Sequence, residues 1–415
     1  MVMLTALMLP AMLVLTGLVL DGGSVYHVKR RLQTSADAGA MGGAHELWRL
    51  NTAGVDAAAR NDVKLNGYYT TYTPPPDGFG NPMPPVVGNA IVTVNHPPLS
   101  GPRTGDTAFV EVIVEQDVKT YLMRLVNRES SRVRARAVAG LVRGAGGCVM
   151  ALDPDERGAL TIQGSSELTA ACGVMVNSTD EGALTANGGG CIDASQIGIA
   201  GGYTPNGPGC LSPTPDTGVM PALDPMAWLT APAMPLLPIE IDFSHSNGDI
   251  VMLPGLYLRG IDISGGNVTF LPGLHILDGG GFKASGNAIL TGNGVTFYNT
   301  NTGPPGRWGD IDIAGTVQAN LSAPDSGPYE GVLFWNDPAS PDRNPGSRIG
   351  GTSDSRFLGA MYFPSTHVIY SGTSTAASWT TIIANTITIE GNAVVTSDFA
   401  STTVQPPMRR ATLVE

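Results

Sequence analysis

Residues 1–20 read MVMLTALMLPAMLVLTGLVL, an apolar run that contains no charged side chain and ends at Asp21. As a helix rising about 1.5 Å per residue, such a run spans roughly 30 Å, which is the thickness of the hydrocarbon core of a bilayer. Pro10 would kink this helix, and a proline is tolerated both in a membrane and in a bundle of like helices. The run therefore predicts a segment that is buried in lipid or against other apolar helices.

The helical pattern continues beyond Asp21, now with one polar side. From Val25 to Leu50, apolar or small residues recur at spacings of three and four, which predicts one face of an amphipathic helix. Small residues occupy the middle of this face, and small residues allow another helix to approach closely. We therefore expect one helix over residues 1–50 that assembles with membrane or pilin-like helices. The small positions of this expected assembly face are Ala36, Ala40 and Gly43.

The same stretch resembles the N-terminal segment of the Flp pilus-assembly TadE/G-like proteins. An apolar helix is followed by Asp, a Tyr five residues later, a basic pair, Leu-Gln and an Ala-Asp-Ala run. CVMALDPDERGALTIQGSSELTAACGVMVNS (residues 148–178), the LPGL segments and the terminal ATLVE resemble the longer TadG-like members. The resemblance implies a structural or adhesive component of a bacterial Tad-type (Flp) pilus system. The matching positions are Asp21, Tyr26, Arg30, Arg31, Leu32, Gln33, Ala36, Asp37 and Ala38.

The sequence departs from the family pattern at its start, where a short basic segment usually precedes the apolar run. This departure predicts a leader that was removed or omitted, and a misassigned start codon or a cleavable signal peptide are the alternatives. Lys29, Arg30 and Arg31 follow the run, and by the positive-inside rule alone they would keep the body of the protein in the cytoplasm. The cysteines indicate the opposite side.

All four cysteines lie between residues 148 and 210, without a C-x-x-C motif or a nearby His pair that would support zinc. Three pairings are open, and we favour Cys148–Cys172 and Cys191–Cys210, each closing a loop of about 20 residues. Disulfides persist in an oxidising compartment. We therefore expect the body of the protein in the periplasm or outside the cell, anchored at the bacterial inner membrane or carried by a cell-surface filament.

Charge divides the chain into two parts. Residues 1–147 hold 14 Lys/Arg and 11 Asp/Glu, a net +3, whereas residues 148–415 hold 9 and 24, a net −15. The acidity of the larger part argues against a nucleic-acid partner. It serves solubility outside the cell or, alternatively, cation binding.

Residues 51–147 predict a small α+β platform. A second helix, or the end of the first, is expected over Ala53–Tyr69, and the Pro- and Gly-rich stretch Thr73–Pro85 cannot form regular structure. Alternating patterns then predict strands, with a helix over Val118–Val126 that turns Tyr121 inward. The expected strands are Ala90–Asn95, Ala108–Glu115 and Arg132–Leu141.

From Cys148 onward, short β-rich runs recur between Gly, Asn and Ser turns. LPGL at Leu253 returns at Leu271, 18 residues later, with Tyr257 and His275 in the same place of each copy. Periods near 20 with alternating apolar residues are typical of a parallel β-helix, whose coils bury their inner faces by stacking. We therefore expect a right-handed parallel β-helix (solenoid) over residues 148–415, and an antiparallel sandwich is the alternative. The expected fold class of the whole chain is mainly β with an N-terminal long α-helix.

Two stretches rich in Pro, Gly and Asp are expected to interrupt the coils as long loops. They are Gly202–Gly248, which would pack Trp228 and its leucines onto the coils, and Thr302–Arg348. Loops of this length usually serve binding or assembly. The terminal Ala411–Glu415 is expected to be a last coil.

A polysaccharide-acting enzyme is one alternative function, because parallel β-helices host lyases and hydrolases. Asp310 and Asp312 share one face of an expected strand near Arg307, and acidic pairs can bind Ca²⁺ or act as acid and base. Carboxylates at i and i+2 on an exposed strand ordinarily face solvent, so these two are only weak metal candidates. No H-E-x-x-H, G-x-S-x-G, phosphate-binding Gly loop or EF-hand loop occurs. We expect neither an enzyme nor a cofactor.

The expected partners follow from these features. Residues 1–50 would contact a membrane or pilin-like helices, and the chain would form a homo-oligomer or a filament, of which it is alternatively the major subunit. The acidic β-helix would display a surface or glycan ligand site.

Overall fold

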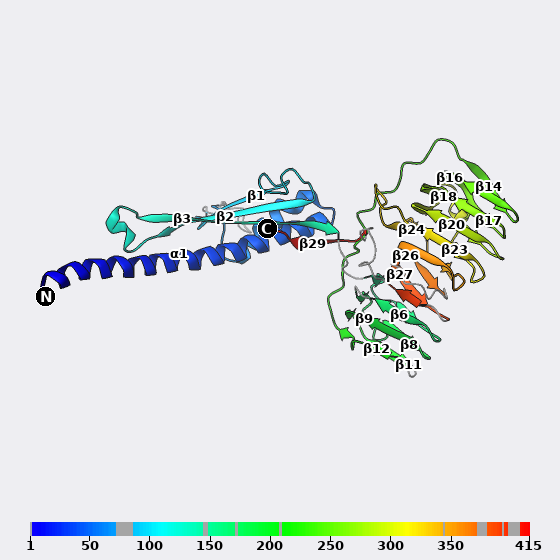
Figure 1. Ribbon diagram of the computed structural model, residues 1–415, viewed down its shortest axis with the longest axis horizontal. Helices are drawn as coiled ribbons and strands as arrows, with labels where there is room; N and C mark the ends of the chain where they lie inside the picture. Colours follow the sequence, from blue (N-terminus) through cyan, green and yellow to red (C-terminus); the bar gives the residue numbers. More distant parts are fainter. Residues whose placement is uncertain are drawn as a thin grey trace, which may run out of the picture. The chain divides into compact units, whose positions relative to one another are not determined.

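The chain is described here by a computed structural model that covers residues 2–71, 86–143, 148–170, 173–206, 210–342, 345–371, 380–391, 394–396 and 407–415, with the backbone only for residues 2–18, 125–126, 143, 205–206, 305 and 394–396. It is mainly β, with an N-terminal helix and a large parallel β-structure (Figure 1). The chain forms two compact units, which we call the platform (residues 1–142 and 409–415) and the β-unit (residues 143–408).

The platform combines two helices with an antiparallel sheet. α1 (Val2–Trp48) is a single helix of 47 residues, and α2 (Val55–Leu65) follows the short 3₁₀ turn η1 (Thr52–Gly54). The sheet has the order β1-β2-β3-β29. Its strands are β1 (Ile91–Asn95), β2 (Phe109–Lys119), β3 (Ser130–Arg143) and β29 (Arg409–Leu413). The expected second helix and three strands are confirmed.

Two expectations for this unit are wrong. The terminal strand β29 belongs to the platform sheet and not to a last coil, since the N–H of Val414 donates to the carbonyl of Val138. The expected helix over Val118–Val126 is instead the end of β2 and the 3₁₀ turn η2 (Met123–Val126). β2 and β3 therefore form one long hairpin, and Tyr121 at its turn is 71% exposed and not inward.

The β-unit consists of strands that pair in parallel ladders, and we call each stretch of chain that contributes one strand in turn to these ladders a coil. The first ladder joins β14 (Glu240–His245), β16 (Gly255–Ile263), β18 (Gly273–Asp278), β21 (Val295–Thr300), β24 (Val332–Asn336), β26 (Arg356–Tyr370), β27 (Thr380–Ile389), β4 (Val149–Ala151), β7 (Val174–Val176), β10 (Ile197–Ile199) and β13 (Asp216–Thr217). The second ladder joins the later halves of β16, β26 and β27 with β19 (Phe282–Ala284), β22 (Ile311–Ile313), β25 (Ser347–Ile349), β5 (Leu160–Ile162), β8 (Leu184–Asn187) and β11 (Tyr203–Asn206).

Two shorter ladders complete the coils. One joins β15 (Asp249–Met252), β17 (Asn267–Phe270), β20 (Ile289–Asn293), β23 (Gln318–Ser322) and the start of β26. The other joins β28 (Val394–Thr396), β6 (Glu167–Ala170), β9 (Cys191–Ala194) and β12 (Cys210–Ser212). Because the described strand pairs of this unit are parallel, an antiparallel sandwich does not fit it.

The coils do not stack in the order of the chain. β27, from the last coil, pairs with β4 and β5 of the first coil. The chain thus enters the stack in its middle and builds toward β13, crosses to the far end at β14, and builds back to the middle. Residues 218–239 make that crossing, and Met226 within it is fully buried against the outer face of the first ladder.

Both stretches expected as long loops contain strands. Residues 202–248 include β11, β12, β13 and β14, and residues 302–348 include β22, β23, β24 and the start of β25. These strands are two to six residues long and lie between Pro, Gly and Asp residues, so they leave little alternation to detect. Trp228 is half-buried, whereas Leu236 and Leu237 are 99% and 80% exposed.

The interior of the β-unit repeats the same contacts from coil to coil. The hydroxyl of Tyr257 donates to the carbonyl of Leu253 (2.5 Å), and His275 Nε2 lies 3.0 Å from the carbonyl oxygen of Leu271. The two LPGL copies therefore place their rings in the same way. Rings of successive coils stack at centroid distances of 6.1, 5.3 and 5.5 Å, in the order Tyr257, His275, Phe297 and Phe334.

Candidate functional site

Asp21 joins α1 to the turn of the β2–β3 hairpin. Its carboxylate is 4% exposed and accepts the backbone N–H groups of Tyr121 (2.8 Å), Leu122 (2.9 Å) and Met123 (2.8 Å). These N–H groups lie at the start of η2, where they have no partner within the turn. The hydrogen bonds from Met123 and Tyr121 lower the pKa of the Asp21 carboxyl. Asp21 is therefore charged and fastens the hairpin to the helix where the apolar run ends.

The small face of α1 packs within the chain, which corrects its expected role. Ala36 and Ala40 are fully buried, in one cluster with Val63 of α2 and Val112 of β2. A Cβ at Gly43 would lie 3.0 Å from Val110 Cγ1. Close approach does require small residues here, as the spacing predicts, but the approaching elements are α2 and β2 of the same chain.

Other predicted positions of α1 also serve the platform. Gln33 Nε2 donates to Asp37 Oδ1 (2.8 Å) and to the carbonyl of Arg136 (2.9 Å), so it ties the helix to β3. Leu32 is fully buried, and the Arg31 guanidinium lies 5.8 Å from the ring centroid of Tyr68. Tyr26 is 66% exposed and Arg30 is exposed. The side chain of Pro10 lies outside the described residues.

Apolar side chains are exposed around Asp21. Val19 and Leu20 are 72% and 64% exposed on α1, and Tyr121 and Met123 are exposed at the hairpin turn. Of the helices that the structure describes, none has the length and apolar character needed to cross a membrane. The side chains of residues 2–18, on which the expected apolar segment rests, lie outside the description.

The arginines of β3 form ion pairs across the hairpin with β2. Arg132 pairs with Asp117 (3.0 Å) and Arg136 with Glu111 (2.5 Å). Glu111 is buried. Burial acts to raise the pKa of its carboxyl, but hydrogen bonds from Ser100, Asn95 and Arg136 outweigh burial and lower the pKa to about 2. Arg136 also pairs with the terminal residue, Glu415. These pairs hold the sheet together and connect the C-terminus to it.

One of the two favoured disulfides is confirmed. Cys191 and Cys210 are bonded, with a Cα–Cα distance of 4.5 Å, and they face each other on the paired strands β9 and β12. Cys148 is also disulfide-bonded. Its expected partner, Cys172, lies outside the described residues.

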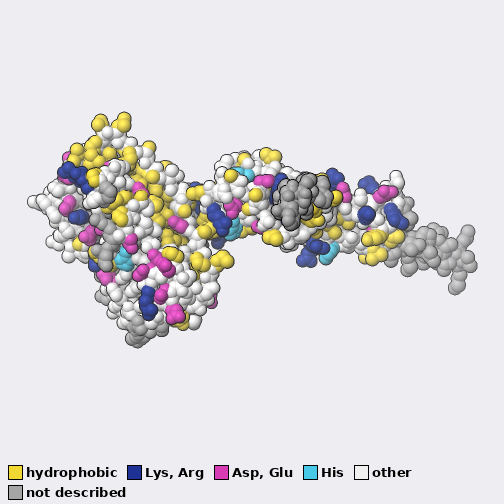
Figure 2. Space-filling view, turned by 180° about the vertical axis from the view of Figure 1, so that it is seen from behind, with side chains coloured by type: hydrophobic (Ala, Val, Ile, Leu, Met, Phe, Trp, Pro, Cys, Tyr) yellow, Lys and Arg dark blue, Asp and Glu magenta, His cyan; other side chains and the backbone are white. Residues whose placement is uncertain are grey.

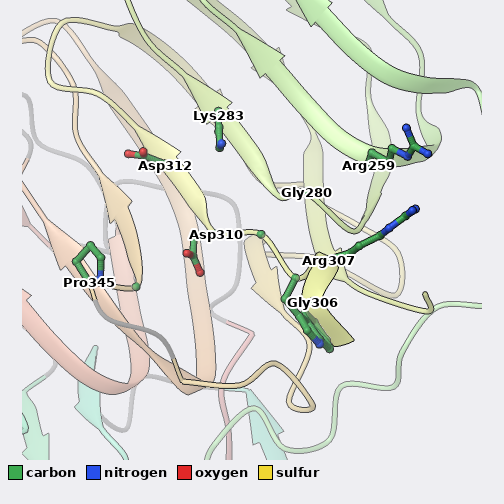
Figure 3. Close-up of a pocket in the computed structure, with 11 residues that line it drawn as sticks. Arg259, Gly280, Lys283, Gly306, Arg307, Asp310, Asp312 and Pro345 are labelled. Atoms are coloured by element: carbon green, nitrogen blue, oxygen red, sulfur yellow. The ribbon is translucent and has the colours of Figure 1, made fainter. Parts of the chain in front are cut away.

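Asp310 and Asp312 line an open pocket of about 700 Å³ on the outer side of the second ladder (Figure 3). Asp312 is outward on β22 between the buried Ile311 and Ile313. The same pocket is lined by Arg307, which the sequence already places near these carboxylates, and by two further cations, Arg259 and Lys283. Within the described residues, no group of three or more His, Cys, Asp or Glu side chains could hold a metal ion.

A second surface feature lies at the β14 end of the stack. Figure 2 shows hydrophobic side chains gathered over this part of the β-unit, where the strand edge of β14 is exposed. The exposed apolar residues there are Leu236, Leu237, Ile239, Ile241, Val251 and Leu253. Patches of this kind in an otherwise acidic surface often mark contacts with other molecules.

Comparison with known families bears on the N-terminal part of the chain. Residues 1–46 match the family described as Putative Flp pilus-assembly TadE/G-like. Neither the curated proteins nor the solved structures contain a match to the chain. The resemblance seen in the sequence is thus confirmed for its N-terminal part, and the match indicates a setting in Tad (Flp) pilus assembly.

The TadE/G-like segment ends two residues before the end of α1. Within it, Asp21, Leu32 and Gln33 make contacts inside the platform, as described above, whereas Tyr26 and Arg30 remain exposed. The hydrogen bonds of Asp21 could not be predicted, because their donors lie about one hundred residues away in sequence. Sequence reasoning also missed Arg259 and Lys283 beside Asp310 and Asp312, although a period near 20 residues could have suggested them.

Proposed function

We propose that this chain is a structural or adhesive component of a Tad-type (Flp) pilus system, held by the first part of α1 and displaying the β-unit outside the cytoplasm. The observation that carries the proposal is the TadE/G-like match over residues 1–46. We further propose that the parallel coils wind as the right-handed β-helix expected from their period, and that the chain has no catalytic role.

The packing of α1 supports different surroundings for its two parts, with the later part packed in the platform and the earlier part in contact with other molecules. The buried platform positions of α1 begin at Asp21 and Leu32, whereas Val19 and Leu20 are exposed. Burying an apolar side chain stabilises by roughly 1.5–3 kcal/mol, so the run before Asp21 requires lipid or other apolar helices around it. Tyr121 and Met123 at the hairpin turn suit a membrane–water interface, where tyrosine is enriched.

The cysteine chemistry supports a location outside the cytoplasm. The Cys191–Cys210 bond and the bonded state of Cys148 need an oxidising compartment. The net −15 charge of residues 148–415 suits a soluble displayed body. The proposed partners are therefore a membrane or pilin-like helices at the N-terminus and a surface ligand on the β-unit.

The test is to locate the native protein and the redox state of its cysteines together. Cells are treated with a membrane-permeant thiol-blocking reagent and then separated into cytoplasm, membranes and sheared surface filaments. We expect the protein in membranes, in filaments or in both, with Cys191 and Cys210 unblocked because they are oxidised. A soluble cytoplasmic protein with blocked, reduced cysteines would overturn the proposal.

A further inference from the structure

The pocket at Asp310 and Asp312 is built by the regular register of the second ladder. Asp262, Lys283, Asp312 and Arg348 occupy equivalent positions on four successive strands. Neighbouring parallel strands lie about 4.8 Å apart, so the side chains form an outward row in which the charge alternates. The residues on either side of this row, such as Phe282 and Ile311, point into the buried core. The row is therefore held in place by the coils.

Loops widen this row into a pocket. Residues of the connection before β22 contribute Arg307, Trp308 and Asp310, and the bend in the middle of β16 contributes Arg259. Figure 3 shows Lys283 and Asp312 on adjacent strands and the guanidinium groups of Arg259 and Arg307 on the other side of the pocket. With about 700 Å³, the pocket is in the size range of sites for small ligands, and it is much larger than a single phosphate needs.

The cations of this pocket are unusual for the unit that carries them. Residues 148–408 contain seven Lys and Arg residues, and three of them line this one pocket. Arg259 pairs with Asp242. Within the described part of the chain, by contrast, the side chains of Lys283, Arg307 and Asp312 have neither a hydrogen bond nor an ion pair. Two cations and one carboxylate are thus available to a ligand.

We propose that this pocket binds an acidic oligosaccharide, that is, a glycan whose sugar units carry carboxylates. Lys283 and Arg307, on opposite sides of the pocket, would each pair with a different carboxylate of the ligand, since charge-assisted hydrogen bonds are the strong ones. Asp312 accepts hydrogen bonds only, and sugar hydroxyl groups donate them. Trp308 supplies a flat apolar surface for the ring of a sugar.

The mixture of charges decides between ligand classes. A polyphosphate or nucleic acid would meet Asp310 and Asp312 in the same pocket, inside a part of the chain with a net charge of −15, and would be repelled. A neutral glycan would leave Lys283 and Arg307 without a partner. A ligand with both carboxylates and hydroxyl groups provides partners for Lys283, Arg307 and Asp312. The inference deepens the adhesive part of the proposed function and rests on it only for the setting in which the glycan is met.

The test measures binding by the purified full-length protein in detergent, using calorimetry with a galacturonic acid oligomer. The controls are a neutral galactose oligomer of equal length and inorganic phosphate. We expect the acidic oligomer to bind at least tenfold more tightly than either control and to remain uncut. Equal binding of the neutral oligomer, or no binding of the acidic one, would overturn the inference.

Variants separate the proposed contacts from general charge effects. Lys283→Ala should weaken binding of the acidic oligomer about tenfold, whereas Arg356→Ala, which removes an exposed cation outside the pocket, should leave it unchanged. Asp312→Asn is the sharpest variant, because at a simple anion site it would strengthen binding and at the proposed site it should weaken binding several-fold. Stronger binding by Asp312→Asn, or equal losses in Lys283→Ala and Arg356→Ala, would contradict the proposal. None of these results depends on where the protein resides in the cell, so they are independent of the localisation test.

Discussion

The imidazole of His275 lies inside the β-unit between the rings of Tyr257 and Phe297, and its side chain is fully buried. Nε2 donates to the carbonyl of Leu271 at 3.0 Å. Burial lowers the pKa of His275 to about 4, so the ring is neutral at pH 7. The period of the repeat predicted the place of this residue, but whether the ring faced solvent or core depended on the coil geometry.

This buried histidine predicts a loss of stability on acidification. In the unfolded chain the histidine binds a proton near pH 6.5, whereas in the folded chain it does so only near pH 4. Its contribution to the free energy of unfolding is therefore complete above about pH 6.5 and declines as the pH falls to about 4, by roughly 3 kcal/mol. Urea unfolding of the wild type and of His275→Phe across this range measures it. The two proteins should differ in slope, and parallel curves would refute the prediction.

Asp21 makes a second prediction for a single residue. Because its pKa is lowered from 3.8, its hold on the hairpin turn is present above about pH 4 and is lost as the pH falls below that value. Asp21→Asn should speed hydrogen exchange of the amides of Tyr121, Leu122 and Met123 at neutral pH. Asp56→Asn, which removes an exposed carboxylate on α2, is the control. Unchanged exchange in Asp21→Asn would show that other contacts hold the turn.

At the scale of the element, α1 shows what a pattern can and cannot predict. Spacing identified the small face with Ala36, Ala40 and Gly43, and this face is indeed tightly packed. A helical face shows where close packing occurs but not which element covers it. Here α2 and β2 do so, and the valines of β2 lie about seventy residues further along the chain. The intrachain contact therefore overrode the expectation of an assembly face.

The covered face gives a prediction for substitutions in α1. Ala40→Leu inserts methylene groups into a full core and should lower the free energy of unfolding of the platform by about 1–3 kcal/mol. Thr34→Leu, at an exposed position of the same helix, should change it little. Urea unfolding and hydrogen exchange in α2 measure both variants. If Ala40→Leu kept full stability but lost its place in membranes or filaments, the face would be an assembly face after all.

At the scale of the whole molecule, a strand from near the end of the β-unit, β27, pairs with the first strands of that unit in the middle of the stack. Ile382 and Ile387 of β27 pair in register with Val149 and Leu160 of the first coil, more than two hundred residues earlier in sequence. Sequence periodicity predicted parallel coils but could not predict their order, because each coil looks alike to its neighbours. Insertions lengthen the coils around residues 302–348, and they interrupt the alternation from which the strands there could have been predicted.

This order predicts that the middle of the stack couples its two halves. Ile387 is fully buried, and Ile387→Ala should cost about 2–5 kcal/mol and speed hydrogen exchange both in residues 148–217 and in residues 240–389. Ile250→Ala, in the end strand β15, should affect only its neighbouring coils. Exchange confined to one half in Ile387→Ala would contradict the pairing of β27 with the first coil.

The central claim is that the run before Asp21 is embedded in lipid or among apolar helices while the remainder of the chain is displayed outside the cytoplasm. Site-specific photo-crosslinking in the native cells tests this most directly, with the reactive side chain at Val14 and, as a control, at the exposed Asn66 of the platform. The account predicts that position 14 crosslinks to lipid or to an apolar helix of another envelope or pilus protein, and that position 66 crosslinks to neither. Crosslinks from position 14 to soluble cytoplasmic proteins, without any to lipid or to such a helix, would contradict it.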